Sequence, residues 1–318
     1  MSDNSSATPN LTPVLSDPRS SGVLWGLLGV TAFSFTVPFT KVAVSGLDPL
    51  FIGAARAVVA AALAAVALAA TRQRLPRKSQ WVRLAVVAAG VVAGFPLLTS
   101  FALTAAPASH GAVVIALLPA ATAVMAVLRG RERTARAFWT ATAAGAVTAI
   151  AFSSVQSGGL GQLHWADLLL FGAVVAAAVG YAEGGMLARE IGAWQTISWS
   201  LVLASPLMVV LTVFSVVRQS PEGTPNQWAA FAYLGVVSMF LGFFAWYRGL
   251  AIGPMARVSQ VQLVQPVLSI CWAWLLLGEG LSVPTVAGGV LVVFCAGWAV
   301  RTRRDPAPNP RSRGVRVP

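Results

Sequence analysis

The sequence predicts an all-α polytopic membrane protein, in which ten transmembrane helices form two inverted five-helix repeats around a central cavity. Composition, long apolar runs and an internal repeat support this prediction. The 318-residue chain is 57% hydrophobic and only 10% charged, whereas soluble domains carry about 25% charged residues. Segments such as Ala57–Ala70 and Leu291–Val300 are almost wholly apolar. Because so few charges cannot cover a water-facing surface, a lipid bilayer is the expected solvent.

The apolar segments divide the chain into predicted spans of about 20 residues, the length at which a helix crosses a bilayer. These spans are 23–43, 47–70, 81–104, 111–128, 137–155, 166–188, 194–217, 228–250, 256–277 and 283–300. Trp25, Trp81 and Trp165 lie at span ends, where indole rings favour the headgroup layer. The predicted domains are a disordered cytoplasmic tail at 1–22, a first repeat at 23–155, a connecting loop at 156–165, a second repeat at 166–300 and a basic cytoplasmic tail at 301–318.

Lysine and arginine residues lie mostly on one side of the predicted spans. Nineteen of the 22 fall on the side that holds both termini, while Lys41 and Arg218 fall on the other and Arg56 lies within a span. Since positively charged loops stay in the cytoplasm, we expect a multi-pass protein of the cell (inner or plasma) membrane with both termini cytoplasmic. The net charge of +12 then reflects topology and a weak attraction to membrane lipids. No nucleic-acid partner is predicted.

The second half of the chain repeats features of the first half at a shift of 147 residues. This shift carries Pro119 onto Pro266, and Glu132 onto Glu279. Each half contains five predicted spans, an odd number, so the second copy must enter the membrane upside down. Inverted repeats of this kind are typical of secondary transporters, which bind their substrate near the bilayer midplane between the two halves.

Several segments, taken together with the repeat, resemble the EamA-like branch of the drug/metabolite transporter superfamily. They are the second span with Arg56, "PLFIGAARAVVAAALAAVALA", the ninth span, "RVSQVQLVQP", and the ending "LLLGEGLSVPTVAGGVLVVFCAGW". In the first half, "VLRGRERTARAFW" replaces the Leu-Gly-Glu turn that is usual in the family. The resemblance covers residues of about 22–300 and implies the 5+5 helix layout. It also implies export of an amino acid, a metabolite or a drug-like molecule.

The ninth predicted span carries polar side chains that its copy in the fourth span lacks. Ser259, Gln262 and Gln265 share one helical face because residues three or four apart lie side by side. The equivalent residues of the fourth span are almost all apolar, so the fold itself does not require amides there. We expect this face to line a substrate cavity, although buried amides also link neighbouring helices. Pro119 and Pro266 are expected to kink their helices, either to free a carbonyl for the cavity or only for packing.

Two charged side chains fall within predicted spans, where an ionised group is costly and usually functional. Arg56 lies about nine residues into the second span and is a candidate for substrate binding. Glu183, in the sixth span, could pair with Arg56, bind a cationic group of the cargo, or take up a proton and so couple transport to a proton gradient. The alternative is that both groups form structural ion pairs. Tyr181 and Trp199 are candidates for contact with an aromatic or apolar part of the cargo.

The sequence lacks patterns that would indicate catalysis or a cofactor. It contains no HExxH, no GxxxxGK[ST] and no metal-ligand spacing, so no catalytic residue, no metal and no cofactor are predicted. The predicted function is secondary active transport by alternating access, most simply export of a small molecule, by a monomer or a homodimer. Two other functions stay open: an intramembrane enzyme that acts on lipid-linked substrates, and a membrane scaffold or receptor that transports nothing.

Overall fold

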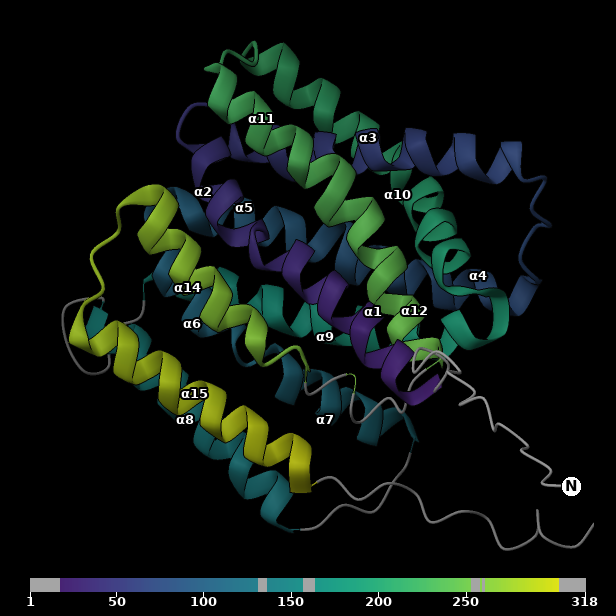
Figure 1. The fold of residues 1–318 in the computed structure, drawn as a ribbon. Helices are drawn as coiled ribbons and strands as arrows, with labels where there is room; N and C mark the ends of the chain where they lie inside the picture. The colour runs from purple at the N-terminus through teal and green to yellow at the C-terminus, as the bar shows by residue number, and fades with distance from the viewer. Residues whose placement is uncertain (1–17, 131–135, 157–163, 253–257, 259–260, 303–318) are drawn as a thin grey trace, which may run out of the picture.

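The computed structural model describes residues 18–130, 136–156, 164–252, 258 and 261–302, and within these ranges the chain is helical and contains no β-strand. The all-α prediction is therefore confirmed. The elements are α1 (Pro18–Ser34), α2 (Thr36–Val44), α3 (Pro49–Ala70), α4 (Lys78–Val87), η1 (Ala88–Gly94), α5 (Phe95–Ala105), α6 (Ala108–Ile115), α7 (Leu118–Gly130), α8 (Arg136–Gln156), α9 (Trp165–Ile191), α10 (Ala193–Arg218), α11 (Pro225–Tyr233), η2 (Leu234–Leu241), α12 (Gly242–Ile252), α14 (Val264–Leu277) and α15 (Val283–Thr302). Helices α3 and α10 pack together on one side, α8 and α15 pack on the other, and α9 runs between them (Figure 1).

Seven helical segments of the described chain are long and apolar enough to cross a membrane, so the chain is a multi-pass membrane protein. They are Ser21–Val44, Pro49–Ala70, Lys78–Ala105, Ala108–Arg129, Trp165–Ile191, Ala193–Arg218 and Pro225–Ile252. Helix α8 is not among them, and Val264–Leu277 and Val283–Trp298 are shorter apolar helices. Each of the ten predicted spans is helical over its described residues, apart from short turns. The count of ten membrane crossings itself stays a prediction.

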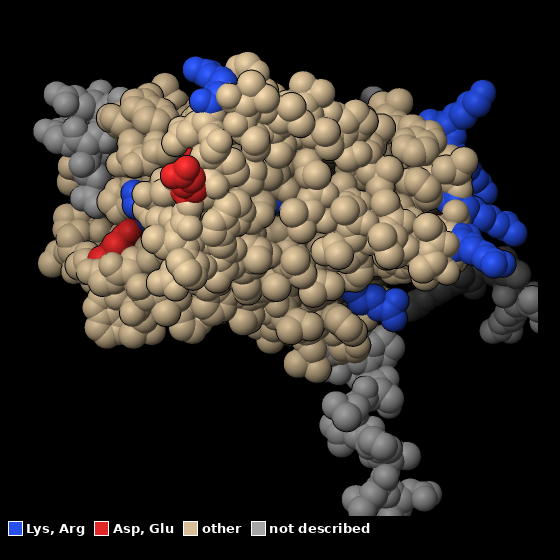
Figure 2. Space-filling model, turned by 90° about the horizontal axis from the view of Figure 1, so that it is seen from above, with Lys and Arg blue, Asp and Glu red and all other residues tan. Residues whose placement is uncertain are grey.

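The surface of the molecule is apolar between two ends that carry the charges. Figure 2 shows a broad uncharged surface with most Lys and Arg side chains gathered at one end. Large apolar side chains such as Val217 and Val283 are exposed, which is unusual over so wide a surface of a water-soluble monomer and suits contact with lipid chains. The end of the bundle where Arg72, Arg77 and Arg129 lie is named the basic end below.

Several helical segments are interrupted near the middle of the bundle. Phe35 separates α1 from α2, Ala116–Leu117 separates α6 from α7, and the π-helical segments η1 and η2 interrupt two further spans. Proline explains part of this pattern because it has no N–H to bond the carbonyl four residues earlier. Pro38 thereby frees the Ser34 carbonyl, which accepts a hydrogen bond of 2.7 Å from the Ser269 hydroxyl. The interruptions therefore place backbone polar groups inside the bundle.

The interruptions and the helix contacts correspond between the two halves of the chain. A shift of 146 residues carries Ala88–Gly94, the whole of η1, onto residues 234–240 within η2. Helix α1 packs against α12 and α14, and its counterpart α9 packs against η1, α5 and α7. The pairs α3–α10 and α8–α15 each join two counterparts. Exchanging the halves thus leaves these helix contacts unchanged.

Glycine allows the helices to cross closely at two of these contacts. A Cβ atom at Gly29 of α1 would lie 2.8 Å from the backbone nitrogen of Trp246 in α12. A Cβ atom at Gly90 of η1 would lie 2.4 Å from the carbonyl oxygen of Ala176 in α9. Small residues serve this purpose in membranes because packing of backbone against backbone holds the helices together there.

Candidate functional site

The interrupted helices surround a cavity in the middle of the bundle, named the central cavity. It is lined by Phe33, Thr36, Arg56, Val91, Phe95, Pro96, Ala177, Tyr181, Ser238, Met239, Phe243 and Gln265, so both halves of the chain contribute. The free volume is about 20 Å³, which is room for one water molecule. A larger guest therefore needs a conformation in which the surrounding helices have moved apart.

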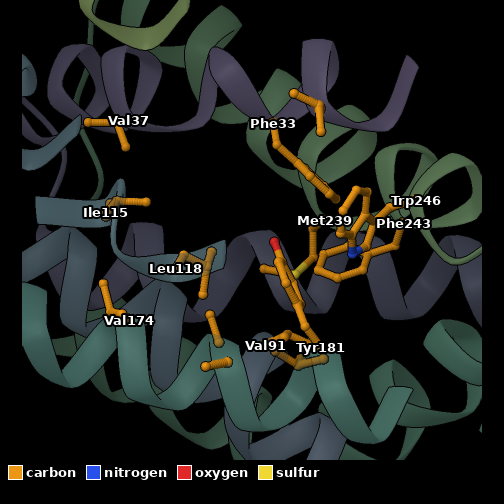
Figure 3. Close-up of a cluster of buried hydrophobic side chains, with 14 of the residues drawn as sticks. Phe33, Val37, Val91, Ile115, Leu118, Val174, Tyr181, Met239, Phe243 and Trp246 are labelled. Carbon is orange, nitrogen blue, oxygen red and sulfur yellow. The ribbon is translucent and has the colours of Figure 1, made fainter. Parts of the chain in front are cut away.

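One wall of the central cavity is aromatic. The ring centroid of Phe33 in α1 lies 4.9 Å from that of Phe243 in α12 and 6.4 Å from that of Tyr181 in α9. Figure 3 shows these rings gathered with Met239 around the same space. Three rings from α1, α9 and α12 and one thioether from η2 offer a large apolar contact surface, so this wall suits an apolar part of a bound molecule.

Arg56 of α3 supplies a positive charge to the same cavity. The side chain is only 1% exposed, and two of its polar contacts are long: 3.5 Å from Nη1 to the Thr40 hydroxyl and 3.4 Å from Nη2 to the Thr99 hydroxyl. Its Nε atom is buried without a hydrogen-bond partner. No carboxylate of the described residues forms an ion pair with it. Arg56 is therefore a buried cation whose hydrogen-bonding capacity is largely unused.

Other polar groups of the cavity come from interrupted segments. The hydroxyl groups of Thr36 and Ser238 are hydrogen-bonded to each other at 2.7 Å, which joins α2 to η2. The Oε1 atom of Gln265 in α14 is buried and has no hydrogen-bond partner. The cavity thus offers an unused acceptor as well as an unused cation.

A second, smaller gap lies next to the central cavity, where α6 and α7 meet α14. It is lined by Val37, Ala112, Ile115, Leu118, Pro119, Gln262, Gln265, Pro266 and Ser269, and its free volume is about 10 Å³. Both amide atoms of Gln262 are buried there without a partner. Pro119 and Pro266 each follow a turn in their helix, at Ala116–Leu117 and at Gln262–Leu263. The two equivalent segments of the repeat therefore face each other across this gap.

The structure brings together some of the residues that the sequence singled out and separates others. Arg56, Tyr181 and Gln265 line the central cavity, and Gln262 lies beside it. Ser259 falls outside the described residues. Trp199 lies elsewhere: it lines a pocket at the basic end together with Arg72, Gln73, Arg74, Leu75, Pro76, Arg77, Gln80, Glu190, Ile191 and Gln195.

Trp199 packs against Trp81 and not beside the central cavity, a contact that the sequence did not indicate. Its ring stands edge-on to that of Trp81, at a centroid distance of 5.8 Å. Trp81 belongs to the first turn of α4, so the contact holds Trp199 at the end of the bundle. The expectation that Trp199 meets cargo inside the bundle therefore has no support in this conformation.

Glu183 of α9 pairs with two arginines, and neither is Arg56, which was one of the partners considered for it. Its carboxylate is 2% exposed and forms ion pairs with Arg83 of α4 and Arg129 of α7. Arg83 also forms an ion pair with Glu190. These four residues, named the charged cluster, join three helical segments at the basic end. Two guanidinium groups flank this carboxylate, so Glu183 ties the three segments together here.

The opposite end of the bundle is held by polar contacts that the sequence did not reveal. His110 Nε2 lies 2.6 Å from Asp167 Oδ1, and both side chains are buried. Lys41 Nζ donates hydrogen bonds of 2.9 Å to two carbonyls at the end of α5. The Glu279 carboxylate accepts hydrogen bonds from the backbone of Ala108 and Ser109 at the start of α6. His110 and Asp167 are 57 residues apart, so local spacing carried no signal of their pairing.

Among the described residues, no group of three or more His, Cys, Asp or Glu side chains is placed to hold a metal ion. The central cavity is instead a mixed site, with a cation and an unused amide oxygen on one part of its wall and aromatic rings on another. Such a lining can bind a small organic molecule that has one charged group and one apolar group.

Comparison with known proteins finds related transporters. The model of the EamA-like transporter family matches residues 20–154 and again residues 164–300. An uncharacterized transporter, YdeK, of Bacillus subtilis is 42% identical over 290 residues, which cover 89% of this chain and 98% of that protein. A probable terminal-alkyne amino-acid exporter of Streptantibioticus cattleyicolor is 24% identical over 90% of this chain and 95% of its own. A crystal structure that is 19% identical, with a TM-score of 0.61 over 88% of this chain and 96% of that one, shares the fold.

Proposed function

This chain belongs to the EamA-like transporter family, and from that premise we propose that it is a secondary active transporter that exports a small molecule by alternating access. Membership and the names of its relatives indicate a transporter rather than an enzyme. The observation that carries the finer proposal is the central cavity, which lies in the middle of the bundle and is lined by both halves of the chain.

Alternating access requires two states of similar energy, which two inverted copies of one unit provide. The proposed copies are residues 23–155 and 166–300, joined by a loop at 156–165. Three observations support this division: the family model matches the chain twice, the π-helical segments coincide at a shift of 146 residues, and the helix contacts exchange with the halves. Ten crossings with both termini in the cytoplasm complete the proposal, and the gathered positive charge at the basic end supports it (Figure 2).

Polar contacts tie helical segments together at both ends of the bundle, which suits an occluded state. The charged cluster closes the basic end by tying α9 to α4 and α7. At the opposite end, the Glu279 carboxylate ties the loop before α15 to the start of α6. We propose that export opens these closures one at a time, with the basic end facing the cytoplasm.

Glu183 remains the candidate for proton coupling within this proposal. Protonation would neutralise the carboxylate that holds Arg83 and Arg129, so proton uptake and opening of the basic end would be linked. Glu183→Gln should then give a correctly inserted protein whose flux no longer depends on pH. Flux that keeps the pH dependence of the parent would remove Glu183 from coupling and leave it the role of closure alone.

Transport itself is tested with purified protein in liposomes. Vesicles are loaded with labelled apolar amino acids, among them a terminal-alkyne amino acid because one relative is named as an exporter of such compounds. Faster efflux than from protein-free vesicles supports the proposal. Val213→Leu, on an exposed face of α10, is the control for insertion and should transport like the parent. The absence of efflux for every compound of the panel, from protein that is folded and inserted, would contradict the proposal.

A further inference from the structure

The central cavity contains a cation, Arg56, that has no counter-charge among the described residues. A guanidinium group has five N–H donors arranged to hold a carboxylate through two parallel hydrogen bonds. Arg56 uses two nitrogen atoms in contacts of 3.4 and 3.5 Å with hydroxyl groups, beyond the usual 2.7–3.2 Å for N–H···O bonds. Its Nε is buried without any partner. A bidentate acceptor is the group that this side chain lacks.

The carboxylates of the described chain do not supply that acceptor. Asp48 Oδ1 accepts hydrogen bonds from the Phe51 backbone and the Ser215 hydroxyl. Asp167 lies against His110, and Glu183 and Glu190 belong to the charged cluster. Glu279 binds the start of α6, and Glu222 lies exposed in the loop between α10 and α11. The counter-charge for Arg56 must therefore come from outside this part of the chain.

The fold does not require an arginine at this position. The shift of 146 residues that superposes η1 on η2 carries Arg56 of α3 onto Val202 of α10. The two helices pack against each other as counterparts, yet the second needs no charge. A buried cation without a partner destabilises the protein, so its presence beside the cavity indicates a binding role.

The rest of the cavity restricts what accompanies the carboxylate. The rings of Phe33, Tyr181 and Phe243 form an apolar wall, and Gln265 Oε1 is an acceptor with no donor. Arg56 is the one charged group among the lining residues of the described chain. Arg56 would repel a cargo with a net positive charge. In an amino acid the carboxylate balances the charge of the ammonium group, which can then donate a hydrogen bond to Gln265 Oε1.

We propose that the cargo is a small carboxylate with a compact apolar group, such as an apolar α-amino acid, and that Arg56 binds its carboxylate. The apolar group packs on the aromatic wall, and the donor group beside the carboxylate bonds Gln265. This inference rests on the proposed function, because it names the cargo class of the same cavity.

The test compares free amino acids with their carboxamides, which have the same side chain and the same amino group but no carboxylate. L-leucine, L-phenylalanine and L-propargylglycine compete, each against its amide, for efflux of the labelled acid from proteoliposomes. We expect the acids to compete at least about 10-fold better than the amides, since a bidentate charged pair is lost. Equal competition by acids and amides would overturn the inference and leave the transporter proposal standing. No efflux of any compound would instead count against the proposed function.

Variants then assign the preference to Arg56. Arg56→Gln should abolish the preference for acids over amides. Arg56→Lys should keep part of this preference because lysine keeps the positive charge but cannot form the two parallel hydrogen bonds of a guanidinium group. Arg218→Gln, which removes an arginine that is exposed over the ring of Phe214, is the matched control and should keep the full preference. An Arg56→Gln protein that still prefers acids would place the carboxylate elsewhere and overturn the assignment. If that variant is not recovered folded, the comparison of acids with amides on Arg56→Lys decides.

Discussion

The charged cluster gives the sharpest prediction about how the transporter opens. Glu183→Gln keeps the size of the side chain but removes the charge that holds Arg83 and Arg129. A hydrogen bond to a charged group contributes about 1.5–3 kcal/mol. Arg83 is 27% exposed and Arg129 is 49% exposed, so solvent screening reduces both contributions to the lower end or below. Because glutamine still accepts one ordinary hydrogen bond, the closed state should lose about 2 kcal/mol.

This loss corresponds to a shift of about 30-fold in the equilibrium between closed and open at the basic end. The assay uses a chain in which Cys271 and Cys295 are replaced by serine and alanine, with Ala177→Cys as the reporter. Ala177 lines the central cavity, so a membrane-impermeant maleimide added from the basic side reaches it only when that end opens. Glu183→Gln should raise the labelling rate by about 30-fold.

Glu190→Gln is the matched control for this measurement. Glu190 is 46% exposed and forms its ion pair with Arg83 alone, and exposed pairs contribute about 0–1 kcal/mol. Its labelling rate should therefore rise less than about 5-fold. If the Glu183→Gln protein is folded but is labelled no faster than the parent, the charged cluster does not close the basic end and the reasoning fails.

Three further predictions concern Gln265, Ser269 and the orientation of the chain in the membrane. Gln265→Leu introduces the residue found at the equivalent position in α7 and should raise the apparent KM for cargo at least about 10-fold. Gln262→Ile should raise the KM less. A larger effect of Gln262→Ile would show that cargo binds in the smaller gap and not in the central cavity. Ser269→Ala should lower the free energy of unfolding by about 1–3 kcal/mol because the Ser34 carbonyl loses the hydroxyl that donates to it at 2.7 Å. Thermal unfolding in detergent measures the change in stability. An unchanged midpoint would show that another donor replaces the Ser269 hydroxyl. A reporter fused after Pro318 should be active only on the cytoplasmic side, and activity on the other side would reverse the proposed orientation.

The sequence predicted the parts of the site that depend on single residues. Arg56 and Gln265 are polar groups within apolar helices, where the cost of desolvation makes them visible without any structure. Comparison of the two halves indicated that the amides of the ninth span were not needed for folding, and the structure leaves three of their polar atoms without partners. Tyr181 also lines the cavity, and its contact with cargo stays a prediction.

Partners of those residues were beyond prediction because they depend on which helices cross. Glu183 lies 100 residues from Arg83 and 54 from Arg129 along the chain, and the nearest intramembrane charge in the sequence suggested Arg56 instead. Trp199 had polar neighbours and a depth that suited a cavity, but packing on Trp81 keeps it at the basic end. Neither contact has a local spacing that could have revealed it.

By itself, the sequence determined the solvent, the helical class and the internal repeat, since hydropathy, loop charge and proline position act locally and add up along the chain. The tertiary structure alone decided that the helix interruptions converge on one nearly closed cavity and that Glu183 joins two arginines at one end. It also decided that Arg56 reaches this cavity without a counter-charge from the residues that the structure describes. The physical reason is that a side chain's partners are set by the crossing of helices far apart in sequence.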